Sequence, residues 1–194
     1  NIIIGKNAGC CLENKCFNVF LGKYAGRLLI GEKNIAIGCC AGTGSPTATD
    51  NTANRNIFLG SYTGTKITTG CYNIVFGEAS GVNMTTARHN VLMGHQAGYC
   101  LCNADNYNVL LGTCAGYNST GGANVAVGMW AMNYMGMGGM NIAIGCNAMR
   151  GSTSNVLCNT GSGNIALGTQ SAYSLTCGQC NMVMGYFSGT CLSC

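Results

Sequence analysis

The sequence is built from one short repeat that runs along the whole chain. Each unit contains Asn, three apolar residues and Gly, and Ala, Ser or Thr follows three residues after the Gly. Aligned on this Gly, consecutive units are 17, 16, 22, 17, 17, 18, 16, 17, 23 and 17 residues apart, so eleven units cover the chain. Such regularity excludes an ordinary globular core and makes the repeat the unit of folding.

The period predicts an all-β fold, a β-solenoid (β-roll or β-helix) of eleven coils with a 16–18-residue period. It is too short for a helix pair, and Gly bounds each short apolar run, which favours strands separated by turns. Coils about 4.8 Å apart would form a rod about 50 Å long. We expect a single repeat domain over 1–194, part of a longer array, with insertion loops at 43–55 and 150–163 in the two long units.

An asparagine stands four residues before the Gly in all eleven units. Stacked in register, amide side chains can donate and accept hydrogen bonds along the rod, so this column predicts a structural ladder. Its members are Asn1, Asn18, Asn34, Asn56, Asn73, Asn90, Asn108, Asn124, Asn141, Asn164 and Asn181.

The three apolar residues after each Asn raise the question of which face each one occupies. Because alternate residues of a strand point to opposite faces, we expect the first and third to fill the coil and the middle one to point outward. No middle residue is polar, and an apolar column facing water indicates an interface, which predicts an inter-subunit face and, for a rod, a closed homotrimer. The predicted face comprises Ile3, Phe20, Ala36, Phe58, Val75, Leu92, Leu110, Ala126, Ala143, Ala166 and Val183.

The consensus N-[IV]-A-[IVL]-G-x-x-A-G, seen in "NIAIGCCAG" and partly in "NVAVGMWAM", is similar to known repeats. It resembles the repeats of phage tail-fibre and large algal-virus attachment proteins and, more distantly, those of trimeric autotransporter adhesin heads. The resemblance covers the whole chain. It implies a rod that serves adhesion, and such rods differ in what they touch.

Composition narrows the function further. Nine basic and five acidic residues are scattered without a basic stripe, which argues against nucleic-acid binding, and no apolar run is long enough to span a membrane. The acids lie in different units, and His89 and His95 have no ligand partners at a useful spacing. We therefore expect no enzyme activity, no catalytic residue, no cofactor and no metal site.

The 15 cysteines allow two readings. "CGQC" and "CLSC" have zinc-site spacing, but Cys177 and Cys194 occupy the same place in consecutive units. Their Cα atoms should then lie about 5 Å apart, within disulfide range, which makes this pair the candidate disulfide. Oxidised cysteines would place the chain outside the cell or on a virion surface, whereas reduced ones would be small apolar fillers.

The variable stretches hold the candidate ligand contacts. Two sequons predict glycosylation at Asn83 and Asn118, although a stretch rich in Ser, Thr and Asn also creates sequons by chance. Loops inserted into solenoids often bind ligands, and they also occur without a task. The candidate binding residues of the two insertions are Thr47, Asp50, Arg55, Arg150 and Asn155.

A cluster of methionines near Trp130 also has two readings. It could be an adaptable contact patch, but the usual burial of Met and Trp favours a wider core or a subunit interface.

These observations predict a structural fibre and attachment protein that contacts itself and cell-surface carbohydrate. The alternative is a purely structural extracellular filament formed by end-to-end stacking, because open coil ends expose unpaired backbone edges.

Overall fold

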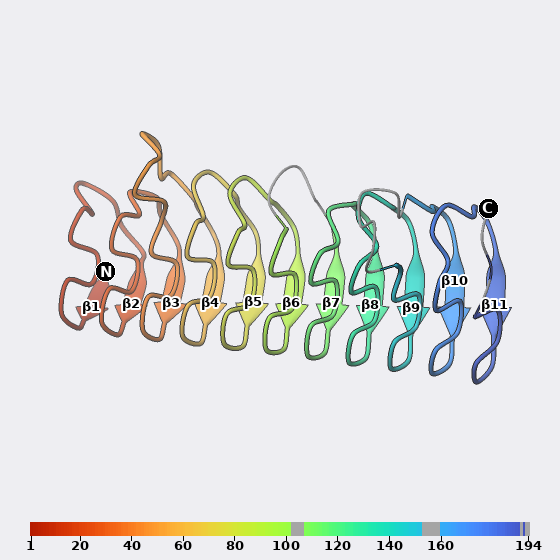
Figure 1. Ribbon diagram of the computed structural model, residues 1–194. Helices are drawn as coiled ribbons and strands as arrows, with labels where there is room; N and C mark the ends of the chain where they lie inside the picture. The colour runs from red at the N-terminus through yellow and green to blue at the C-terminus, as the bar shows by residue number, and fades with distance from the viewer. Residues whose placement is uncertain (102–106, 153–159, 191, 193–194) are drawn as a thin grey trace.

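The computed structural model describes residues 1–101, 107–152, 160–190 and 192, and it confirms the β-solenoid. Eleven three-residue strands, one per repeat unit, form a single parallel sheet in chain order (Figure 1). The strands are β1 (Ile2–Ile4), β2 (Val19–Leu21), β3 (Ile35–Ile37), β4 (Ile57–Leu59), β5 (Ile74–Phe76), β6 (Val91–Met93), β7 (Val109–Leu111), β8 (Val125–Val127), β9 (Ile142–Ile144), β10 (Ile165–Leu167) and β11 (Met182–Met184). We number each coil after its strand.

The register of the sheet does not depend on the length of the unit. Middle residues pair with middle residues throughout, and Ala36 pairs with Phe58 even though the unit between them is 22 residues long. The extra residues of the insertion at 43–55 project beyond the neighbouring coils (Figure 1). Insertions therefore change the edge of the rod and leave the sheet intact.

The asparagine column forms a buried hydrogen-bonded ladder. At each of its ten steps the backbone N–H of one Asn donates to the side-chain Oδ1 of the Asn in the preceding coil, at 2.9–3.1 Å. The Nδ2 of Asn73 donates to Asn56 Oδ1 at 2.9 Å and to the carbonyl of Ala87 at 2.8 Å. One amide thus joins its own coil to the coil before it and the coil after it.

The glycine that ends each strand permits close stacking of the coils. Gly112 has a φ of +134°, and a Cβ added there would lie 2.6 Å from the carbonyl oxygen of Gly128. Gly185, in the last coil, has a similar φ but would meet nothing closer than 3.8 Å. Both the backbone conformation and the neighbouring coil therefore require glycine within the stack.

The structure reverses the expected orientation of the apolar triplets. The middle side chains point into the coil, and ten of the eleven are buried; Ile3, in the first coil, is 41% exposed. The predicted inter-subunit face was therefore wrong, because its members point into the coil and all but Ile3 are buried core residues: Ile3, Phe20, Ala36, Phe58, Val75, Leu92, Leu110, Ala126, Ala143, Ala166 and Val183. The first and third residues, expected inside, face outward.

The buried asparagine explains this reversal. Alternate residues share a face of a strand, so Ala36 must point the same way as Asn34, and both are fully buried. The coil is narrow and encloses few side chains. In the second coil Phe20 packs with the small residue Ala25 and with Leu29, all fully buried.

Core volume is balanced within most coils rather than at a position; coil 3 is an exception, since it combines Ala36 with Gly42, which packs against Phe58 of coil 4. Where the strand contributes a large middle residue, the second Gly of the repeat is kept: a Cβ on Gly116 would lie 2.6 Å from Leu110 Cδ1. In coils 8 to 10 the middle residue is alanine, and this Gly is replaced by a buried larger residue with φ of 49–52°. The replacements are Met132, Met149 and Ala172.

The methionine cluster accordingly divides between core and surface. Met132, Met135 and Met149 are fully buried, as the core reading predicted. Trp130 is 39% exposed and Met137 is 61% exposed, so these side chains remain available for contacts.

We predict that Asn73→Ala destabilises the rod by about 2–4 kcal/mol, because the backbone N–H of Asn90 loses its acceptor and the backbone carbonyl of Ala87 loses its donor. Asn181→Ala is the matched control, since Asn181 donates to Asn164 but no later Asn in the chain donates to it. Urea unfolding followed by circular dichroism measures both. Equal losses of unfolding free energy in Asn73→Ala and Asn181→Ala would contradict the role of the ladder.

We also predict that Ala143→Leu and Met149→Gly compensate each other. Alone, Ala143→Leu overpacks coil 9 and lowers the free energy of unfolding by about 1–3 kcal/mol. Met149→Gly alone leaves a cavity that lowers it by about 2–4 kcal/mol. Together they recreate the Leu110–Gly116 arrangement of coil 7. The double variant should be more stable than the sum of the single losses by at least about 1 kcal/mol, and strict additivity in a double-mutant cycle would refute the compensation.

Candidate functional site

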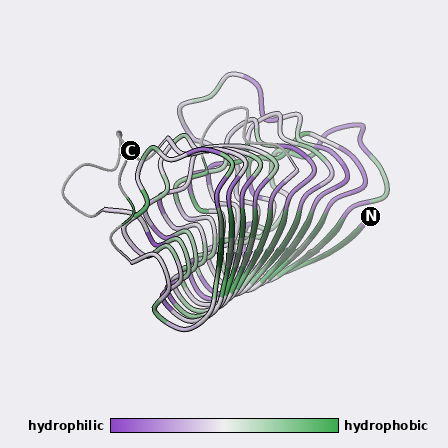
Figure 2. Ribbon diagram, turned by 90° about the vertical axis from the view of Figure 1, so that its right-hand side faces the viewer, coloured by the Kyte–Doolittle hydropathy of each residue, from purple (hydrophilic) through white to green (hydrophobic). Residues whose placement is uncertain are grey.

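Two surfaces stand out, the first being the outer face of the sheet. We define the outer face as the first and third residues of the eleven strands. All are apolar and none is buried; Ile4 is 66% exposed and Ile144 is 44% exposed. The strands form a continuous hydrophobic band along one side of the rod (Figure 2). A patch of this extent is typical of an interaction surface.

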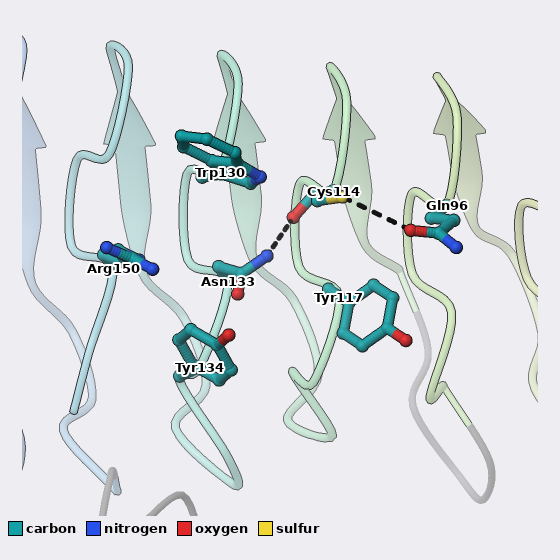
Figure 3. A pocket seen from close by; sticks show the side chains of 7 residues that line it. All are labelled: Gln96, Cys114, Tyr117, Trp130, Asn133, Tyr134 and Arg150. Carbon is teal, nitrogen blue, oxygen red and sulfur yellow. Dashed lines mark hydrogen bonds between the residues drawn. The ribbon is translucent and has the colours of Figure 1, made fainter. Parts of the chain in front are cut away.

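The second surface is a groove on another side of the rod, lined by residues of coils 6 to 9 (Figure 3). Its volume is about 320 Å³, within the range of small-molecule sites. We call it the Trp130 groove; its lining residues are Gln96, Cys114, Tyr117, Trp130, Asn133, Tyr134 and Arg150.

The groove lies where a stack of two tyrosine rings ends. The fifth residue after the strand-ending Gly is Tyr99 in coil 6 and Tyr117 in coil 7, and their rings stack at 4.9 Å with an interplanar angle of 9°. The same position is Asn133 in coil 8, Arg150 in coil 9 and Tyr173 in coil 10. Tyr99 and Tyr117 therefore form a two-ring stack that ends at coil 8, where the column continues with Asn133 and Arg150.

Some of the polar groups that line the groove already form hydrogen bonds within the protein. The Asn133 side chain is 4% exposed, and its Nδ2 donates to the backbone carbonyl of Cys114 at 2.8 Å. The Cys114 thiol donates to Gln96 Oε1 at 3.6 Å (Figure 3). These bonds fix the two amides in place and leave Asn133 Oδ1 and Gln96 Nε2 for other partners.

Arg150 supplies the charge of the groove. Its guanidinium lies 5.5–5.8 Å from the ring centres of Trp130, Tyr134 and Tyr173, and its Nη1 donates to the Tyr173 hydroxyl. Its Nε is buried without a hydrogen-bond partner. None of the described carboxylates pairs with it.

Burial raises the pKa of the Tyr117 hydroxyl above its usual value of 10, and the neighbouring Cys100 and Tyr99 raise it further. The phenol is therefore a neutral donor at physiological pH.

A second, smaller cavity of about 240 Å³ lies beside coils 3 and 4, lined by Glu32, Lys33, Asn54 and Arg55. Arg55 lies over the Tyr72 ring and donates to its hydroxyl at 2.8 Å. The described lining of this cavity carries two cations, Lys33 and Arg55, beside one acid, Glu32, and includes no aromatic side chain.

The predicted binding residues do not form one site. Arg150 lines the Trp130 groove, whereas Arg55 lines the smaller cavity. Thr47 and Asp50 are exposed on the insertion loop and line neither cavity. Asn155 lies outside the described residues.

Sequence reasoning missed the stacked columns. His89 lies between Tyr72 and Tyr107, with ring centres 5.0 Å apart on both sides. The residue before each ladder asparagine has φ of 56–66° wherever it is not glycine, so rings in this column are superposed coil after coil. Reading the repeat by column instead of along the chain would have revealed both stacks.

The cysteines in the described part of the chain are mainly thiols. Cys177 is in a disulfide, and its predicted partner Cys194 lies outside the described residues, so that pairing stays a prediction. The described cysteines outside disulfides are Cys10, Cys11, Cys16, Cys39, Cys40, Cys71, Cys100, Cys114, Cys146 and Cys180. Within the described ranges no three His, Cys, Asp or Glu side chains are grouped to hold a metal ion.

The two sequon asparagines, Asn83 and Asn118, are half-buried and occupy the same column. Asn83 Nδ2 lies 3.9 Å from the Cys100 sulfur. Their glycosylation stays a prediction. In the part of the chain described, no helix has the length and apolarity that a membrane crossing requires.

Comparison of the chain with protein-family models, with curated proteins and with solved structures gives no match. The functional argument therefore depends on the two surfaces themselves.

We predict slow alkylation of Cys11 and Cys40 below pH 9, because burial, and after it the adjacent thiols Cys10 and Cys39, raise their pKa values above the usual 9.0. The reactive thiolate is then scarcer at pH 8 than in the unfolded chain. Peptide mapping of iodoacetamide labelling against pH, with and without urea, measures this. Restricted access to the thiol would lower the maximal labelling rate, whereas a raised pKa moves the midpoint of the labelling rate to higher pH in the folded chain than in the unfolded chain. Equal midpoints in the folded and unfolded chain would contradict the prediction.

Proposed function

We propose that this chain is a non-catalytic structural rod of an extracellular or virion-surface fibre. In this proposal copies of the chain pack through their outer faces, and the variable side of the rod serves attachment to surface glycans. The outer face carries the proposal, since each of eleven strands directs two apolar side chains away from the core. The disulfide at Cys177 supports an oxidising location.

The area of the outer face supports a stable contact between two copies. Eleven strands at about 4.8 Å and three residues at about 3.3 Å give a footprint of roughly 500 Å² on each chain. Two such faces bury roughly 1,000 Å², the size at which specific interfaces begin. The outer face is long, regular and uncharged, and the partner that matches it is the outer face of a second copy of the chain.

The width of the face favours a pair of sheets over the closed homotrimer that the sequence suggests. Packed sheets lie about 10 Å apart, so each sheet would be about 5 Å from a symmetry axis. A triangle with that inner radius has sides of about 17 Å, which exceeds the width of about 10 Å of a three-residue strand. Three such faces would leave open corners, whereas two cover each other.

Charge favours an antiparallel pair. Eight of the nine basic residues precede residue 89, and Arg150 is the exception. A two-fold axis perpendicular to the rod sets the basic half of one chain against the nearly uncharged half of the other. The parallel arrangement would bring the two basic halves together.

We predict that Leu111→Glu combined with Val127→Glu, paired neighbours on the outer face, abolishes self-association and leaves the fold intact. Glutamates buried without partners at an interface cost several kcal/mol, so the dissociation constant should rise more than about a hundredfold. Leu110→Glu, in the core of the same strand, should instead unfold the chain. Sedimentation velocity and circular dichroism give the two readouts.

The same sedimentation experiment separates the assemblies. A mass of twice the 20.0 kDa chain supports the pair, three times that mass supports the trimer, and open-ended polymers unaffected by the glutamates support end-to-end stacking. A wild-type chain that stays monomeric at high concentration would refute association through the outer face.

A further inference from the structure

We propose that the Trp130 groove binds a carboxylate-bearing sugar ring, the acidic residue of a glycan chain. This inference deepens the attachment role proposed above by naming its site and ligand class. It does not depend on which face joins the copies, because the groove and the outer face share no residue.

The first argument is the space beside the end of the two-ring stack. One face of Tyr117 stacks on Tyr99 of coil 6, and the next residue of the column, in coil 8, is Asn133, which adds no ring to the stack. Tyr117 and Arg150 are two coils apart, or about 10 Å. That distance admits one six-membered ring stacked on Tyr117, and sugars stack on aromatic faces through their C–H groups.

The second argument is the arrangement of hydrogen-bonding groups around that space. The Asn133 amide forms the buried floor and is oriented by its bond to Cys114, while the Gln96 amide is oriented by the Cys114 thiol. The half-exposed Trp130 indole lies on the same coil as Asn133, at one side of the groove (Figure 3). Fixed amides beside aromatic walls suit the alternating apolar and hydroxyl surfaces of a pyranose.

The third argument is the unmatched charge. Arg150 is held by three aromatic rings and the Tyr173 hydroxyl, and its buried Nε lacks an acceptor. The described acids, Glu13, Glu32, Asp50 and Glu78, belong to coils 1 to 5, and the groove is lined by coils 6 to 9. A carboxylate on the ligand supplies the complementary group, because guanidinium binds carboxylate through paired, charge-assisted hydrogen bonds.

Trp130 makes the test specific, because it is the only tryptophan of the chain and its fluorescence reports the groove. We would titrate the full chain with methyl glucuronide and with methyl glucoside, which differ at the carboxylate. The expected result is a saturable change in Trp130 fluorescence with affinity at least roughly tenfold higher for the glucuronide. No response to either probe, or equal responses to both, would overturn the proposal.

Three variants locate the binding. Asn133→Tyr extends the two-ring stack into the groove and should abolish binding while the rod stays folded. Arg150→Gln should remove the preference for the glucuronide, and Arg55→Gln, a matched control at the smaller cavity, should change nothing. If Asn133→Tyr does not fold, Tyr117→Leu removes the stacking platform instead; binding that survives loss of the platform would refute the site.

Failure of this inference and failure of the fibre proposal have different signatures. Groove variants that lose sugar binding should sediment like the wild type. The outer-face glutamates should leave the Trp130 titration unchanged. A chain that associates but shows no sugar response would overturn the groove and keep the rod.

Discussion

The asparagine ladder is the interaction on which the rest of the structure depends. Nine of the eleven amides are buried, and an amide within the stack, such as Asn73, joins three coils, so the asparagine side chain must point inward. Strand alternation then directs the middle apolar residue inward and its two neighbours outward. The ladder thus fixes the core, the outer face and the register together, and the long insertion at 43–55 does not disturb it.

The period, the strands and the columns could be predicted from the sequence because they repeat at fixed offsets. The orientation of the triplets could also have been predicted, since a buried Asn34 requires a buried Ala36, two residues later. The error came from treating the apolar triplet separately from the asparagine. The composition of the three strand positions does not show which of them is buried, because all three are apolar in every unit. Only the asparagine that precedes them distinguishes the inner face from the outer face.

The Trp130 groove was harder to predict for a physical reason. Its walls come from columns two, five and six residues after the glycine, and they belong to four different coils. No stretch of chain contains them, and Arg150 appeared only as a residue of an insertion. What distinguishes the groove is a change within one column, from Tyr117 in coil 7 to Asn133 and Arg150 in coils 8 and 9. The repeat provides the scaffold, and the residues that differ from coil to coil give the groove its own set of side chains.

The outer face differs from the groove, because its apolar pattern repeats in every strand without an exception. Strands such as Ile57–Leu59 and Val109–Leu111 are apolar on both faces, a composition typical of parallel sheets that are covered on both sides. The coil covers only the inner side. An isolated rod would leave the other side in water along its whole length, and a charge at any one of these strands would relieve that exposure at little cost to the fold. The absence of any charge from all eleven strands is therefore best explained by a partner surface that would reject one, and a copy of the same sheet meets that requirement.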